Sequence, residues 1–302
     1  MKVERGLSLG ILIIILFIIA TLIKCSNDGK PGEGTEGMIY YSFNWEKALS
    51  GYPVPSRLYY CFYPVDKGPS IQTESDRDGL AFFLPPGKYN LLIYNCDAEN
   101  INFRNLNDFE TAEAYIPVGK ASEKEISKIT PLYGIAVENV VVKSGENALV
   151  KMSPVPLVKE VVFNIKVDGI ENVTSCTGSI SNISHALNLS KQEVVKVTAG
   201  NLAFEAVPSE EGVSANVMIL GKATPQGGDE EPSPALSHEV AFNFTLNDGS
   251  TVTSSVDIGT SLEETEGSKV EIQIDATIEK LSSFTLKINH WQVASGDSLV
   301  IE

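Results

Sequence analysis

Apolar and polar residues alternate with a period of two along much of the chain after residue 38, and this pattern limits the folds available to it. The clearest segments are 39–45, 161–167, 240–246, 270–278 and 284–288. Because successive strand residues point to opposite faces, each segment has one apolar and one polar face. Asn247-Asp248-Gly249-Ser250 is the clearest hairpin turn. Helical patterns are confined to one or two turns at 121–129 and 183–189. The sequence therefore predicts an all-β protein built from antiparallel β-sandwiches.

The strand pattern restarts after Pro154-Val155-Pro156, and the length of the chain suits two domains of ordinary size. We expect an N-terminal β-sandwich over 38–153 and a C-terminal β-sandwich over 154–302. Residues 25–37 are rich in glycine and lack a large apolar side chain, which is typical of a flexible tether. The tether spans at most about 40 Å when extended.

Residues 1–24 read as a signal peptide for export. Lys2 and Arg5 precede an apolar run from Leu7 to Ile23. The run ends at Leu22-Ile23-Lys24-Cys25, which resembles the lipobox of bacterial lipoproteins, with Lys24 in place of the usual small residue. This predicts lipid attachment at Cys25. One alternative is an uncleaved anchor helix, because the run is near the minimum length that spans a bilayer. A lipid and an anchor helix both tether the folded part to a membrane at its N-terminus. The remaining alternative is an ordinary signal peptide.

The net charge argues against some classes of binding partner, and the cysteine content leaves two possibilities for disulfide pairing. The chain carries a net charge of −16, which argues against nucleic acid or an anionic membrane surface as a partner. If Cys25 carries a lipid, then Cys61, Cys96 and Cys176 remain. Cys61 and Cys96 lie in strand-like segments and are able to pair; the alternative is three buried free thiols.

The sequence offers no catalytic, cofactor-binding or metal-binding residues, so we do not expect an enzyme. Gly296-Asp297-Ser298-Leu299 matches the nucleophile motif of an esterase family, but three residues follow it and no downstream base is possible. The only histidines, His185, His238 and His290, lack the spacing of metal ligands.

Exposed aromatic residues are the remaining functional hint. Tyr59, Tyr63 and Trp291 are candidates for contacts with a glycan or peptide. For Tyr59 and Tyr63 the alternative is a strand covered on both faces, because Leu58, Tyr60 and Phe62 make the other face apolar as well.

Several motifs resemble a known family. They are Phe43-Asn44-Trp45, the strand Leu58–Tyr63, and the segment Phe83–Asn95 with its Pro-Pro-Gly-Lys-Tyr turn. Together they resemble Bacteroides surface lipoproteins related to fimbrillins. Residues 157–163 and 179–183 are similar to the second domain of fimbrial anchor subunits.

The resemblance implies two tandem transthyretin-like β-sandwich domains on a lipoprotein of the outer membrane, at the cell surface. It implies a non-enzymatic structural or adhesion role as a fimbrial anchor or tip subunit. Other fimbrial subunits would be partners through β-strand addition, after proteolysis behind an arginine, for which Arg57 and Arg77 are candidates. The rival hypothesis is a surface lipoprotein that binds a glycan or a peptide.

Overall fold

The computed structural model describes residues 36–78, 81–118, 125–126, 128–195, 199–224, 236–263, 267–279 and 283–293, with backbone alone at 125–126, 278–279 and 283–293. Strands dominate this part of the chain. Its only helices are α2 (Gly259–Glu263) and a single 3-10 turn, Ile170–Asn172. None of its helices has the length and apolar character needed to cross a membrane. The prediction of an all-β protein is confirmed.

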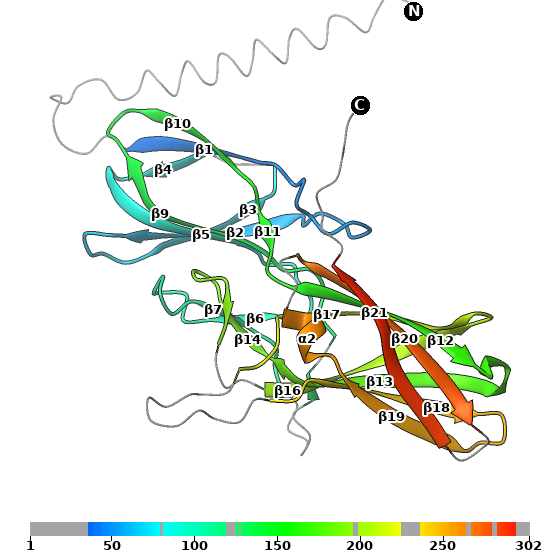
Figure 1. Cartoon of the computed structure of the whole chain (residues 1–302). Coiled ribbons are helices and arrows are strands. Elements are labelled where there is room, and N and C mark those ends of the chain that lie inside the picture. The colour runs from blue at the N-terminus through cyan, green and yellow to red at the C-terminus, as the bar shows by residue number, and fades with distance from the viewer. Residues whose placement is uncertain are drawn as a thin grey trace, which may run out of the picture. The chain divides into compact units, whose positions relative to one another are not determined.

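Two sheets face each other in the first half of the chain, and Figure 1 shows them as two layers. One has the strand order β10-β1-β4 and the other the order β11-β9-β5-β2-β3. Their strands are β1 (Gly37–Phe43), β2 (Arg57–Pro64), β3 (Ile71–Asp76), β4 (Ala81–Leu84), β5 (Gly87–Asn95), β9 (Tyr133–Val142), β10 (Asn147–Met152) and β11 (Val155–Pro156). A buried core that includes Ile39, Tyr60 and Leu91 fills the space between the layers.

A long sheet dominates the second half, with the order β19-β18-β13-β16-β17-β12-β20-β21 and β8 beside β16. Its strands are β8 (Glu125–Ile126), β12 (Lys159–Asp168), β13 (Val173–Ser184), β16 (Ala199–Ser209), β17 (Gly212–Ile219), β18 (Glu239–Leu246), β19 (Thr251–Asp257), β20 (Lys269–Glu279) and β21 (Ser283–Val293). Its end strands β19 and β21 approach each other to within 8 Å between Cα atoms, so the sheet curls around its core. Phe163, stacked on Phe204 at 5.7 Å and edge-on to Phe242 at 5.6 Å, lies in this core.

The predicted hairpin at 240–258 is confirmed as β18 and β19, with Gly249 in the turn at a φ of 83°. Most neighbouring strands are antiparallel, as expected, and a few pairs are parallel. The first strand of each half, β1 and β12, pairs in parallel with a late strand, β10 and β20 respectively. Between β1 and β10 the chain runs through strands of the other sheet, and between β12 and β20 it runs mainly through further strands of the same sheet, before it returns in the same direction.

Strand pairs also join the two halves. The short sheet β15-β14-β7-β6 combines β6 (Asn102–Arg104) and β7 (Glu113–Tyr115) with β14 (Ala186–Asn188) and β15 (Glu193–Val194). Residues 36–302 form one compact unit. The division into domains at 153/154 stays a prediction. The helical turn expected at 183–189 is wrong, because this segment ends β13 and forms β14, where pairing with β7 supplies its backbone hydrogen bonds.

Candidate functional site

Strand β1 lies in the centre of its three-stranded layer, between β10 and β4. Ile39 and Tyr41 on its inner face are 1% and 4% exposed. The Tyr41 ring lies 6.0 Å from that of Tyr60 and 6.3 Å from that of Phe62. Removing β1 would leave a slot between two strands with unpaired backbone groups, which an added strand is able to fill. Strand exchange is therefore geometrically possible in this layer.

The connection from β1 to β2 packs and hydrogen-bonds against Tyr133 of β9, and these contacts hold β1 in place. Leu49 is buried, and its backbone N–H donates to the Tyr133 hydroxyl at 3.0 Å. The Trp45 ring meets the Tyr133 ring edge-on at 5.6 Å. Because burial and hydrogen bonding both oppose separation, β1 is held by contacts beyond its own sheet.

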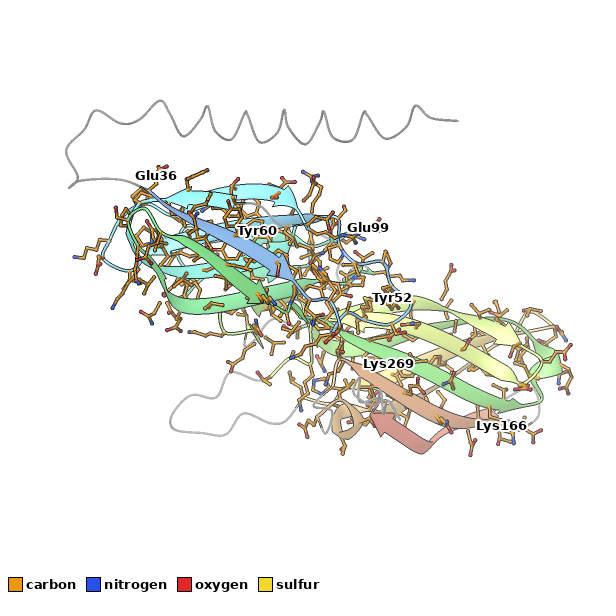
Figure 2. The ribbon with its side chains drawn as sticks, turned by 90° about the horizontal axis from the view of Figure 1, so that it is seen from above. Glu36, Tyr52, Tyr60, Glu99, Lys166 and Lys269 are labelled. Carbon is orange, nitrogen blue, oxygen red and sulfur yellow. The ribbon has the colours of Figure 1, made fainter. Side chains whose placement is uncertain are left out.

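A second contact that holds the β1–β2 connection in place is made by Tyr52, whose hydroxyl donates a hydrogen bond to Glu160 Oε1 at 3.0 Å. Asn216 Nδ2 donates to the same oxygen at 2.6 Å, and Glu160 is only 4% exposed. Burial, followed by the hydrogen bond to Glu160, raises the pKa of Tyr52 to about 12. Figure 2 labels Tyr52, in the connection between β1 and β2, while Glu160 belongs to β12. The network therefore satisfies a buried carboxylate and ties the two halves together.

Arg57, the first candidate for proteolytic processing, begins β2 and forms an ion pair with Glu74 on β3. β3 and β5 flank β2, so the residues after Arg57 are hydrogen-bonded on both sides. The residue before it, Ser56, donates its N–H to Asp97 Oδ2 at 2.8 Å. A protease must extract an extended stretch of chain, so cleavage at Arg57 requires local unfolding of a central strand.

Arg77, the second candidate, directly follows the edge strand β3. Its side chain is 44% exposed, and its partner Asp78 is 88% exposed at 3.4 Å. The Arg57 side chain is 58% exposed, so the two sites differ in backbone pairing rather than in side-chain exposure: Arg77 follows an edge strand, whereas Arg57 begins a strand paired on both sides. A cut after Arg77 leaves β1 joined to β2 and β3, whereas only a cut near Arg57 would free β1 alone. The fold therefore favours retention of β1.

An arginine-specific protease should test this difference, because the chain contains only Arg5, Arg57, Arg77 and Arg104. We expect the first cut within the folded part to fall after Arg77, with Arg57 cleaved at least about 100-fold more slowly because it needs sub-global opening. Mass spectrometry of fragments during digestion of the native protein measures both rates.

Arg77→Lys is the matched control for this digestion. It removes the fast site for an arginine-specific enzyme while keeping the charge. Rapid appearance of a fragment beginning at Leu58 would contradict the protection of Arg57.

The expected platform of exposed aromatic residues does not form at Tyr59 and Tyr63. Tyr63 is 7% exposed, and its hydroxyl donates to the Leu106 carbonyl at 3.0 Å. Tyr59 is half-buried, donates to Gln72 Oε1 at 3.2 Å and lies 5.5 Å from the Tyr94 ring. The alternative of a strand covered on both faces is correct, because the segment from Ala98 to Ile116 covers the second face. The Trp291 side chain lies outside the described part of the structure.

The described cysteines are free thiols, so Cys61 and Cys96 do not pair. Cys61 is fully buried, and burial raises its pKa to about 11. Cys176 is also buried, with a pKa raised to about 12 for the same reason. Both thiols are therefore protonated near neutral pH and act as small apolar core residues.

Within the described residues, no group of three or more His, Cys, Asp or Glu side chains is placed to hold a metal ion. His238 is 4% exposed and lies 3.2 Å from the Ala223 carbonyl through Nε2. Burial lowers its pKa, so its neutral form is favoured as a structural residue. Cys25 and the segment 296–299 lie outside the described residues.

Two features were missed by reasoning from the sequence. The Tyr52–Glu160–Asn216 network joins residues more than 50 positions apart, and no local pattern points to it. The outer face of the β10-β1-β4 sheet exposes Tyr40, Phe83 and Leu149. The adjacent pairs Tyr40-Tyr41 and Phe82-Phe83 were the available signal, because one member of each pair must point away from the core.

Comparison with known proteins identifies a matching family model and a related protein. The model of a family described as "Domain of unknown function (DUF5119)" matches residues 38–205. The chain is 24% identical over 214 residues to a Bacteroides ovatus protein named "Putative fimbrium anchoring subunit Fim4B". The alignment covers 67% of this chain and 62% of that protein, so the chain spans less than two thirds of its relative's length.

Solved structures share the fold over almost their full length. A crystal structure titled as a putative adhesin from Bacteroides ovatus matches with a TM-score of 0.60 and 18% identity, over 83% of this chain and 95% of the other. The fimbrial anchor protein Mfa2 from Porphyromonas gingivalis matches with a TM-score of 0.52 and 13% identity, over 84% and 97% respectively. The resemblance to fimbrillin-related proteins is confirmed.

Proposed function

Since the chain belongs to the DUF5119 family, we propose that it is a non-enzymatic, fimbrillin-type adhesion subunit held at the outer surface of the cell by a lipid on Cys25. Within a fimbrium it takes the role of an anchor or tip. The observation that carries the proposal is the match to the fimbrial anchor protein Mfa2 over 84% of this chain and 97% of the other, seen together with a relative named as an anchoring subunit.

The contacts that hold β1 in its sheet favour the role of an anchor or tip subunit over that of a shaft subunit. A shaft subunit that exchanges strands must open a slot for its neighbour. Here β1 is held by its own core contacts, by Leu49 on Tyr133 and by Tyr52 on Glu160. A subunit tethered to the membrane also stays at the base of a fimbrium, which favours the anchor role.

The rival hypothesis of a glycan- or peptide-binding lipoprotein has less support. It requires a flat exposed aromatic platform, and the inward-facing positions of Tyr59 and Tyr63 remove two of its three candidate residues. A crystal structure of "putative polysaccharide binding proteins" from Bacteroides thetaiotaomicron is 10% identical to this chain and shares only the fold.

A deletion strain of the organism that encodes the chain tests the anchor role. We expect fimbriae to move from the cell fraction to the culture medium when the chain is deleted, because the assembled fibre loses its attachment. Immunoblotting of both fractions for the main fimbrial subunit measures the shift. Complementation with the natural chain should restore attachment.

Complementation with Cys25→Ala separates the lipid from the protein. We expect this variant to lose incorporation of an alkyne-labelled fatty acid and to leave fimbriae in the medium. Fimbriae that remain on cells in the deletion strain would refute the anchor role. An acylation signal that persists in Cys25→Ala would refute the lipid assignment alone.

A further inference from the structure

The outer face of the β10-β1-β4 sheet is apolar although nothing in the described structure covers it. Cross-strand partners point to the same face, so the register defines its members. They are Met38, Tyr40, Ser42, Ala81, Phe83, Asn147, Leu149 and Lys151. We call this set the β1 outer face. The opposite face of the same strands lines the core.

The large apolar side chains of the β1 outer face are contiguous. Tyr40 lies directly opposite Leu149, and Met38 lies directly opposite Phe83. Tyr40 and Phe83 are diagonal neighbours, within reach of aromatic side chains. Tyr40, Phe83 and Leu149 are 41%, 62% and 65% exposed. Grouped exposure of this kind marks a surface that meets a partner, whereas scattered apolar residues do not.

The charge of the β1 outer face differs from that of the whole chain. The chain has 39 acidic residues and a net charge of −16, yet this face carries no acidic side chain and one lysine, Lys151. Glu36 and Glu146 lie at the end where β1 begins, and Glu146 pairs with Lys143 at 3.2 Å. The face therefore suits a neutral apolar surface.

The position of the face relative to the tether indicates which surface it meets. β1 begins at Gly37, twelve residues after Cys25. Figure 2 marks Glu36, where the described chain starts, at the beginning of β1. Twelve residues reach at most about 40 Å. A lipid on Cys25 would thus hold this strand, before any other part of the fold, close to the membrane.

We propose that the β1 outer face rests on the lipid surface of the membrane in which the chain is anchored, with Tyr40, Phe83 and Leu149 entering the boundary between head groups and acyl chains. The inference depends on the lipid anchor of the proposed function. A second copy of the chain is the weaker occupant, because two bodies of net charge −16 repel each other. The tether, by contrast, raises the local concentration of lipid for every molecule.

The test uses the full, lipidated chain in vesicles of phosphatidylcholine and phosphatidylethanolamine that contain a phospholipid with a photoreactive acyl chain. After illumination, mass spectrometry locates labelled peptides. We expect labelling of the peptides containing Tyr40, Phe83 and Leu149 to exceed that of the peptide containing Val207 by about tenfold, the ratio that corresponds to 1.4 kcal/mol of preference.

Two double variants sharpen the test. Phe83→Ser with Leu149→Ser should reduce labelling of all three peptides to the level of the Val207 peptide. Val65→Ser with Val141→Ser is the matched control, because these residues are 44% and 53% exposed outside the face and leave the Val207 reference peptide unaltered, and it should change nothing. All four positions are exposed, so melting temperatures should stay within about 2 °C of the natural chain.

Three other outcomes would contradict the proposed membrane contact, and each points to a different explanation. Uniform labelling of an acylated protein removes the membrane contact and leaves the anchor intact. Labelling that disappears as the protein is diluted within the vesicles, or crosslinks between copies through β1, assigns the face to a second copy. Absence of the acyl group on Cys25 refutes the proposed anchor, and the membrane contact with it.

Discussion

Replacing Tyr41 by alanine should lower the free energy of unfolding by about 3–5 kcal/mol, while replacing its neighbour Tyr40 by alanine should change it by less than about 0.5 kcal/mol. The two residues share a strand and a side-chain type, but Tyr41 is 4% exposed and Tyr40 is 41% exposed. Tyr41 contacts the rings of Tyr60, Phe62 and Phe82, so its loss leaves a cavity in the middle of the first sandwich. Urea unfolding of both variants measures the difference.

Tyr41→Phe is the control that separates packing from hydrogen bonding. The Tyr41 hydroxyl is buried without a hydrogen-bond partner, and burial raises the pKa of its phenol. Removing the hydroxyl should therefore leave stability unchanged or increase it by about 1 kcal/mol. Equal losses for Tyr40→Ala and Tyr41→Ala would show that β1 is not held by its inner face and is free to leave its sheet.

Truncation after Glu279 should unfold the second half of the protein, because it removes β21. β21 pairs with β20 along almost its entire length. β20 carries Val270, Ile272 and Ile274, each at most 1% exposed. Large buried side chains contribute about 1.5–3 kcal/mol each, against a total stability of about 5–15 kcal/mol. Circular dichroism during heating should show loss of the cooperative transition, or a melting temperature lower by at least about 10 °C.

Truncation after Val293 is the matched control, because it keeps β21 and removes only the residues that follow it. We expect its melting temperature to equal that of the full chain. Unchanged melting after truncation at Glu279, with loss of binding to other fimbrial subunits, would mean that β21 is donated to a neighbour and that the chain is a shaft subunit.

The strands could be predicted from the sequence, because alternation with a period of two is a local property of the backbone. The hairpin of β18 and β19 and the strands β12 and β20 lie where the alternation and the Asn-Asp-Gly-Ser turn placed them. The resemblance through Pro-Pro-Gly-Lys-Tyr and its neighbouring strands led to the fimbrillin-related fold for the same reason: it resides in contiguous residues.

Which faces are covered and which strands are neighbours could not be predicted from the sequence, because both depend on contacts between distant segments. Alternation shows that Tyr59 and Tyr63 share a face, but the segment that buries Tyr63 lies more than 40 residues away. The segment 183–189 resembles a helical turn until β7 pairs with it. The central position of β1 in its sheet, and with it the contrast between Tyr40 and Tyr41, depends on β10, which pairs with β1 from more than 100 residues further along the chain. Sheet order arises from such long-range pairing, and a single sequence contains no local signal for it.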